Sequence, residues 1–211
     1  MDYIFNLMTS LYGMTVTAML CIALAAKGSK SNEMALFSTA LVCSTFILLY
    51  GFRTIETGTD TFAYKSWFES INGTTSSRDF EPLFLLFGKS ISCFTNDASI
   101  FFLIITTITI FFLIKAFKIN NNLIAVPIAI TMCFSFISGV DLIVNGIRSG
   151  LALSFATYAL IKFSNDSKNL YFFVAISIAS MLHTSCVIFY LALIIIKIIN
   201  EKNVKIFFMP T

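Results

Sequence analysis

The sequence predicts an all-α protein, a polytopic bundle of about six to seven transmembrane helices with one long extracytoplasmic loop. Three observations predict this fold class. Of the 211 residues, 57% are apolar and only 12% are charged, whereas about a quarter of an ordinary soluble domain is charged. Long stretches carry no formal charge, and lysine gathers at one set of their ends. We therefore treat residues 1–211 as a single integral-membrane domain in contact with the lipid bilayer.

The composition also excludes several kinds of partner and cofactor. A net charge of +3 without any basic run argues against binding of nucleic acid. The five cysteines show no CxxC spacing and lie mostly in apolar runs, and the chain has a single histidine. We therefore expect no metal site, no disulfide framework and no cofactor.

The expected crossings follow from the lengths of the charge-free runs, because a helix needs roughly 20 apolar residues to cross the hydrocarbon. Four runs reach or approach that length, and a fifth does so if Asn145 and Arg148 are accepted inside it. The last run is long enough for two short helices that meet near His183. The first run lacks the basic start of a cleavable signal peptide. The expected crossings are 3–26, 35–52, 98–114, 121–139 and 142–162, followed by an in–out–in pair from 169 to 199.

The distribution of charge orients these crossings with the N-terminus outside. Nine of the eleven lysines then lie at cytoplasmic ends, and five positive charges, including all three arginines, lie outside. A single span over 169–196 would instead place the last three lysines outside, so we prefer the pair. Because arginine makes planar, bidentate contacts with phosphate or carboxylate, we expect the chemistry at the outer face.

Residues 53–97 contain the only long polar segment and form the expected extracytoplasmic loop. Within it, the apolar segment Glu81–Phe94 is interrupted by a lysine. If this segment crossed the membrane, Lys115 and Lys118 would lie outside, against the lysine bias. We therefore predict a re-entrant or interfacial segment there. The stretch Phe62–Ile71 predicts an interfacial amphipathic helix whose aromatic residues lie in the headgroup zone, namely Phe62, Trp67 and Phe68.

The first polar constellation begins at Arg53 and ends at Tyr64. Gly58 permits a tight turn, Thr59 or Asp60 can cap the helix that follows, and Tyr64 lies one turn further on. A simple helix cap with solvated charges explains this spacing equally well.

The second constellation surrounds Arg148. At 100° per residue, three small residues form one stripe suited to close helix packing (Gly146, Gly150 and Ser154), and Asn145 and Arg148 lie on the opposite side. This pattern predicts a helix that presents Asn145 and Arg148 to a cavity. The alternative is an arginine that reaches the lipid headgroups.

The third constellation is His183-Thr184-Ser185, and Ser177, Ser180 and Thr184 form one polar stripe beside the histidine. Its functional interpretation is a neutral imidazole that accepts a proton near pH 7. The alternative is a histidine that packs against a neighbouring helix with a hydrogen bond. The chain has no GxSxG elbow, so Ser185 and His183 do not form a hydrolase triad.

Together these segments resemble the EpsG/Wzy family of bacterial polymerases, which act on lipid-linked polysaccharide repeat units. Members of that family are considerably longer, with further helices after the histidine motif, so we expect this chain to be an N-terminal part of the family architecture. Four motifs in the expected order, between about residues 50 and 190, carry the resemblance: Gly58-Thr59-Asp60-Thr61 with Tyr64 after Arg53, Glu81-Pro82-Leu83-Phe84, Asn145-Gly146-Ile147-Arg148-Ser149-Gly150-Leu151-Ala152, and His183-Thr184-Ser185.

The resemblance implies a glycosyltransferase of the bacterial cytoplasmic (inner) membrane. It would join undecaprenyl-diphosphate-linked oligosaccharides at the outer leaflet, with a flippase and a chain-length regulator as candidate partners. Asp60 or His183 would act as base for the attacking hydroxyl, and Arg148 with Arg53 would stabilise the leaving diphosphate. The catalytic candidates are thus Asp60, His183 and Arg148, and the substrate-binding candidates are Arg53, Thr59, Tyr64, Glu81 and Asn145.

Two other classes of function stay open at this point. A transporter of the same lipid-linked glycans would also need arginine. A polar stripe through the inner halves of the spans would indicate a transporter, but these halves are nearly free of charge. A non-catalytic membrane scaffold is the other class. For the polymerase we predict that Arg148 and His183 border one outward-open pocket with Asp60 over its mouth. A separation above about 15 Å would prevent one lipid-linked sugar diphosphate from touching both.

Overall fold

The computed structural model describes residues 31–72, 80–118, 123–166 and 169–191, together with a few positions between 15 and 24 and residues 194 and 195. The regular structure in these residues is entirely helical, which confirms the all-α class. The first expected crossing and the last part of the final pair fall mostly outside the described residues.

Within the described residues, two helices are long and apolar enough to cross a membrane, and both match expected crossings. Helix α2 (Asn32–Gly51) begins after Ser31, whose hydroxyl accepts the N–H of Met34. Helix α5 (Ala98–Phe117) begins after Asp97, whose carboxylate accepts the N–H of Ser99 at 2.8 Å. These side chains satisfy N–H groups that have no partner within the helix.

The next two expected crossings are both interrupted. Helices α6 (Ala125–Ser135) and α7 (Ile137–Val144) are separated by the extended backbone of Phe136 and are bent by 86°, so they form one broken span or a re-entrant loop. The expected crossing at 142–162 is broken ahead of α8 (Ile147–Asp166). The described residues thus hold two candidate spans, or three with the bent pair. The count of six to seven crossings stays a prediction.

The remaining helices are short. Helix α3 (Thr61–Ser70) occupies the expected amphipathic segment, and α4 (Pro82–Ser92) occupies the expected re-entrant or interfacial one. Helix α9 (Asn169–Leu182) ends where the backbone of His183 becomes extended, and the 3-10 helix η2 (Thr184–Val187) follows. Over residues 169–191 the last apolar run therefore has helical structure on both sides of a break at the histidine, where the sequence predicts one.

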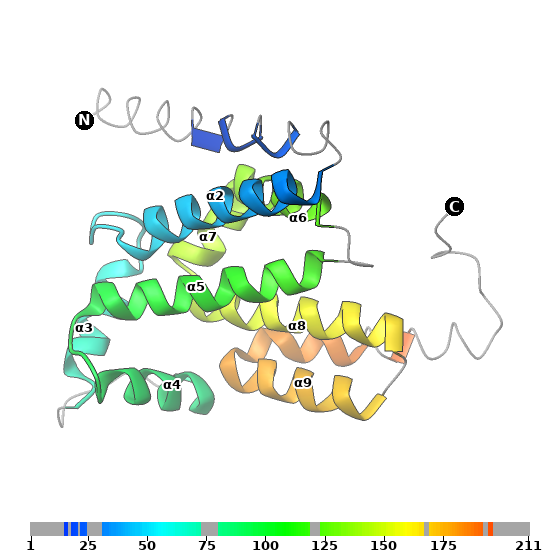
Figure 1. The fold of residues 1–211 in the computed structure, drawn as a ribbon. Helices are drawn as coiled ribbons and strands as arrows, with labels where there is room; N and C mark the ends of the chain where they lie inside the picture. The colour runs from blue at the N-terminus through cyan, green and yellow to red at the C-terminus, as the bar shows by residue number, and fades with distance from the viewer. Residues whose placement is uncertain are drawn as a thin grey trace.

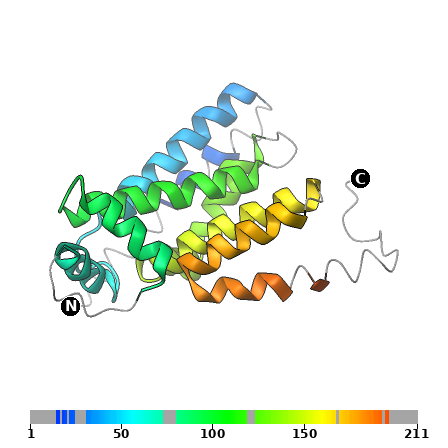
Figure 2. The same cartoon turned by 90° about the horizontal axis from the view of Figure 1, so that it is seen from below.

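Four of the longer helices lie side by side in the order α2, α5, α8, α9, and each packs against the next (Figures 1 and 2). Helices α2 and α9 run opposite to α5 and α8, so the C-terminal ends of the first two lie with the N-terminal ends of the other two (Figure 1). Helices α3 and α4 lie at this same end (Figure 1). We call it the loop end; Lys115 and Lys162 lie towards the opposite end of α5 and α8.

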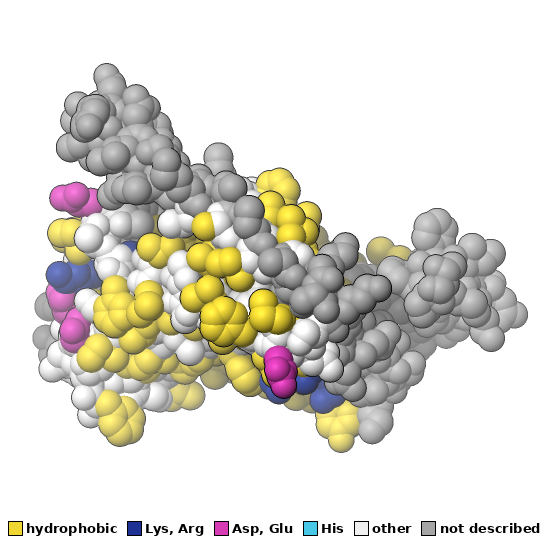
Figure 3. Space-filling model, turned by 45° about the horizontal axis from the view of Figure 1, so that its top comes forward, with side chains coloured by type: hydrophobic (Ala, Val, Ile, Leu, Met, Phe, Trp, Pro, Cys, Tyr) yellow, Lys and Arg dark blue, Asp and Glu magenta, His cyan; other side chains and the backbone are white. Residues whose placement is uncertain are grey.

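Buried side chains form two apolar clusters. One includes Phe46, Ile110 and Phe134 and joins α2, α5, α6 and α7. The other joins α3, α4, α5, α8 and α9. Between the charged edges of the face drawn in Figure 3, hydrophobic side chains cover much of the surface, as expected for a protein whose helices contact lipid.

The interfacial placement of α3 is only partly correct. Phe62 is 63% exposed, but Trp67 and Phe68 are 3% and 1% exposed and belong to the second cluster. Trp67 stacks on Phe84, with ring centroids 5.5 Å apart. The sequence pattern does not predict this packing, because it depends on apolar residues of other helices: Trp67 packs against Phe84 of α4, and Phe68 stacks on Phe101 of α5.

Candidate functional site

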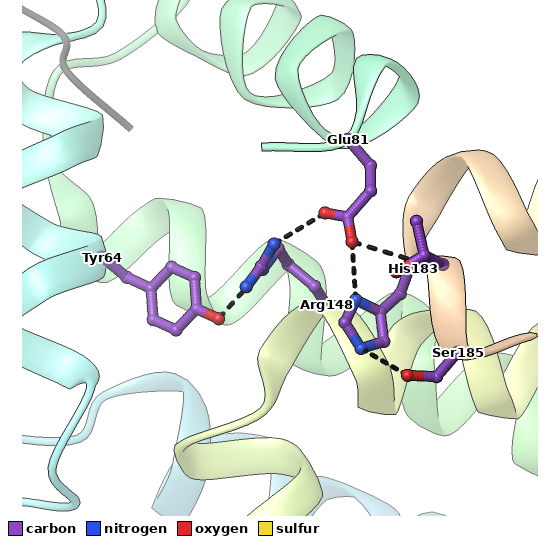
Figure 4. Close-up of polar contacts among 6 residues, drawn as sticks. Tyr64, Glu81, Arg148, His183 and Ser185 are labelled. Atoms are coloured by element: carbon purple, nitrogen blue, oxygen red, sulfur yellow. Dashed lines mark hydrogen bonds and ion pairs between the residues drawn. The ribbon is translucent and has the colours of Figure 1, made fainter. Parts of the chain in front are cut away.

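The carboxylate of Glu81 joins two distant segments at the loop end. Its Oε2 accepts a hydrogen bond from Nη1 of Arg148 at 2.6 Å, and its Oε1 lies 2.7 Å from Nδ1 of His183 (Figure 4). The backbone N–H of Thr184 also donates to Oε1, at 3.3 Å. Arg148 lies in the first turn of α8, Glu81 directly before α4, and His183 directly after α9. Arg148 and His183 are therefore far closer than about 15 Å, the limit for sharing one substrate.

Aromatic side chains hold the guanidinium of Arg148 in place. Its Nε donates to the hydroxyl of Tyr64 at 3.2 Å (Figure 4). Its Cζ lies 4.4 Å from the centroid of the Phe80 ring and 6.0 Å from that of Tyr64. Such stacking favours the cation and orients its plane. We call Tyr64, Glu81, Arg148 and His183 the Glu81 cluster.

The hydrogen bonds of His183 define which of its nitrogens carries a proton. Because an ionised carboxylate only accepts hydrogen bonds, Nδ1 donates to Glu81. In a neutral imidazole Nε2 is then unprotonated and able to accept a proton. The hydroxyl of Ser185 lies 3.1 Å from Nε2 (Figure 4). The side chain of His183 is 19% exposed, so the ring is only partly shielded from its surroundings.

Glu81 is held in its ionised form. Burial alone would raise its pKa, but hydrogen bonds from its own backbone, from His183 and from Arg148, together with the charge of Arg148, lower the pKa below the ordinary glutamate value. The cluster thus contains a carboxylate, a guanidinium and an imidazole, and these groups are 11%, 23% and 19% exposed.

The loop before α3 is docked against the α7–α8 junction by Asn145. The Oδ1 of Asn145 accepts the backbone N–H of Thr59 at 2.7 Å and that of Asp60 at 3.4 Å. Gly58 has a φ of +83°, and a Cβ there would collide with Asn145 Oδ1. This position therefore requires glycine both for its backbone conformation and for the close approach.

Arg53 lies in a different environment from Arg148. Its Nη1 donates to the carbonyl of Ile143 at 2.8 Å and to that of Tyr50 at 3.3 Å, and its Cζ lies 4.0 Å from the Phe102 ring centroid. The residue is 7% exposed, and burial lowers its pKa to about 10. Its cation thus binds carbonyls at the C-terminal ends of α2 and α7, where the helix dipoles favour positive charge.

Asp60 occupies the N-cap position of α3, but its side chain makes no capping hydrogen bond. Its Oδ1 accepts from the hydroxyl of Thr59 at 3.4 Å, and the residue is exposed. Among the described contacts it has none with Arg148, Glu81 or His183. The expected place of Asp60 over the mouth of a pocket remains a prediction.

The small-residue stripe of α8 is only partly as expected. Gly146 precedes the helix, whereas Gly150 lies so close to the carbonyl of Leu142 that a Cβ would collide with it, and Ser154 is buried. Close packing at Gly150 holds the first turn of α8, which carries Arg148, against the end of α7.

Comparison with known proteins identifies the family of this chain. The profile of the EpsG family matches residues 36–211. The chain belongs to the EpsG family. No curated protein and no solved structure matched it. Membership makes it a polysaccharide-related membrane protein, and the matched region of this EpsG-family protein contains the whole Glu81 cluster.

Sequence reasoning missed contacts of the Glu81 cluster and of Asn145 in the EpsG-family protein. It named Glu81 only as a substrate-binding candidate, and it did not identify Phe80 beneath Arg148 or Asp141 beside Asn145. Phe80 is adjacent to Glu81 in sequence, and Asp141 is four residues before Asn145, which is a helical spacing. These two signals were available, but neither shows by itself which groups meet.

Proposed function

We propose that this protein is a polymerase of lipid-linked oligosaccharides in the bacterial inner membrane. A sugar hydroxyl of the acceptor attacks the anomeric carbon of the donor. The bond from that carbon to the diphosphate oxygen breaks, and undecaprenyl diphosphate leaves with the bonding electrons. The single observation that carries this proposal is that Glu81 brings a guanidinium and an imidazole together at one end of the helices.

The geometry favours His183 over Asp60 as the base. With its Nδ1 donating to Glu81, His183 has Nε2 available to take the proton of the attacking hydroxyl. The carboxylate orients the ring and stabilises the imidazolium that forms. The carboxylate of Asp60 has no such arrangement in the described contacts.

Arg148 is the group that fits the leaving diphosphate. Its described hydrogen bonds occupy two of its five N–H donors, and its side chain is 23% exposed. Charge developing on the diphosphate oxygen as the bond breaks strengthens its interaction with a guanidinium held in place beforehand. Arg53, which binds backbone carbonyls, is assigned to the structure of the helix ends instead.

Expression of the protein in a strain that lacks its polysaccharide polymerase tests this function. We expect a ladder of glycan lengths, and we expect His183→Gln and Arg148→Lys to abolish it at unchanged protein abundance. Single-repeat glycan without a ladder, for wild-type protein at normal abundance, would contradict a polymerase. Restored surface export of single repeats would then favour a transporter, and no change in glycan would favour a scaffold.

A further inference from the structure

The amide of Asn145 connects three parts of the loop end. Its Nδ2 donates to the carboxylate of Asp141 at 2.6 Å, and its Oδ1 accepts the backbone N–H groups of Thr59 and Asp60. Asp141 lies on α7, and the two N–H groups precede α3. The arrangement uses both ends of the amide, so its polar atoms already have partners in the protein.

These hydrogen bonds set the start of α3 relative to the start of α8. Asn145 lies three residues before Arg148, and Asp60 lies four residues before Tyr64. The two helices that Asn145 holds together are therefore those that bring the hydroxyl of Tyr64 to Nε of Arg148. While Nε of Arg148 donates to Tyr64, its Nη1 donates to the carboxylate of Glu81.

We propose that Asn145 is a positioning residue that docks the loop before α3 and thereby aligns Arg148, instead of a residue that binds the glycan substrate. This inference rests on the proposed function for the role of Arg148, although the docking itself does not depend on it. Gly58 belongs to the same arrangement. A glycine readily adopts its positive φ, and the absence of a Cβ lets the loop lie this close to Asn145.

An exchange of two side chains tests this role. Asn145→Asp removes the N–H that donates to Asp141 and places two carboxylates against each other. Their repulsion should turn the side chain at position 145 away from the Thr59 and Asp60 N–H groups and release the loop. Adding Asp141→Asn restores one amide and one carboxylate with their positions reversed. The amide introduced at position 141 donates to the carboxylate introduced at position 145, which still accepts the backbone N–H of Thr59. The net charge equals that of the wild type. A direct contact between Asn145 and substrate would not be restored by this exchange.

Two measurements are made on the whole 211-residue chain. Hydrogen exchange followed by mass spectrometry reports the Thr59 and Asp60 amides, and glycan ladders report polymerisation. For Asn145→Asp we expect these amides to exchange about tenfold faster or more, with polymerisation about tenfold lower or less. The double variant should return both to within about threefold of wild type. Glu56→Gln, an exposed change in the same loop, is the matched control and should alter neither.

Gly58→Ala provides a second variant that changes no polar group. It should speed exchange of the same two amides and lower polymerisation, because the added Cβ displaces the loop from Asn145. Unchanged amide exchange in Asn145→Asp would overturn the docking. Restored exchange without restored polymerisation in the double variant would overturn the positioning role. Absence of polymer from the wild type would contradict the proposed function. It would not affect the test of docking, because amide exchange is measured without substrate.

Discussion

The middle of the helix bundle and its loop end are held together by different interactions. In the middle, hydroxyl groups bond to carbonyls of their own helix, as Thr45 does to Leu41, Thr107 to Leu103 and Thr131 to Pro127. Such bonds leave the helix surfaces free for apolar packing. At the loop end, the side chains bond across distant segments instead.

Sequence separation makes the difference clear. In the part of the chain that the structure describes, the side-chain hydrogen bonds that join residues 67 to 103 positions apart all lie at the loop end. They involve Arg53, Asn145 and the Glu81 cluster. The apolar middle depends on volume and shape and should tolerate conservative changes. The loop end depends on specific atoms, so changes that preserve size or charge should still be harmful.

The largest expected effect comes from Arg148→Lys. An ammonium keeps the charge but cannot bond to Tyr64, Glu81 and a phosphate in the planar geometry of a guanidinium. We expect polymerisation to fall about 100-fold with protein abundance unchanged. Glycan ladders normalised to protein abundance measure this, with Lys65→Arg on the exposed face of α3 as control. Normal polymerisation by the lysine variant would show that Arg148 only anchors the protein at the membrane surface.

Glu81→Gln should have the next largest effect. The amide is nearly the same size, but it carries no charge for Arg148 and no longer requires His183 to present Nδ1–H. We expect polymerisation to fall roughly 10- to 100-fold. Asp97→Asn, which changes a carboxylate at the start of α5, should have little effect by the same ladder assay.

The pH dependence of stability gives a separate test of Glu81. Because its pKa is lowered in the folded protein, the ionised carboxylate contributes stability above the unfolded pKa of about 4.3 and loses that contribution as pH falls through the lower folded value. The thermal midpoint of the wild type should therefore exceed that of Glu81→Gln down to about pH 5, and the two midpoints should converge in stronger acid. Convergence already between pH 8 and 6 would contradict the ion pair.

A smaller effect is expected in the middle of the bundle. Ile110→Val removes one methylene from a fully buried side chain in the cluster of α2, α5, α6 and α7. We expect a loss of about 0.5–1.5 kcal/mol in stability and unchanged polymerisation per molecule, measured by thermal unfolding and by ladders. A loss of polymerisation as large as that of Glu81→Gln would remove the distinction between the two regions.

The smallest effect on activity is expected from cysteine substitutions at the two ends of the bundle, which test its orientation by labelling. In a Cys93→Ser background, which removes the exposed native thiol after α4, Glu56→Cys at the loop end should react with an impermeant thiol reagent on intact cells. Lys118→Cys at the other end of α5 should be protected in the same background. Neither exposed substitution should change polymerisation by more than about twofold. The reverse labelling pattern would place the loop end in the cytoplasm and exclude an outer-leaflet reaction.

The sequence predicts the all-α class, the helices at 35–52 and 98–114 and the break at His183, because hydropathy and local backbone preferences act over short distances. It does not reveal the bend at Phe136 or the burial of Trp67, since both depend on packing between segments. Arg148 and His183 stand out in the sequence as polar groups within apolar runs. Their link through Glu81 could not be derived, because no local pattern specifies a contact over 67 to 102 positions.

Reconstitution of the purified protein with undecaprenyl-diphosphate-linked oligosaccharide as the only substrate tests the central claim most directly, namely that Arg148 and His183 act together through Glu81. The amounts of polymer and of released undecaprenyl diphosphate are measured for wild type, Arg148→Lys, His183→Gln and the double variant. We predict that both products form together in the wild type and that each single variant loses nearly as much as the double one, since groups that act as a unit are not additive. Full product formation by either single variant, or losses that multiply in the double variant, would contradict the claim.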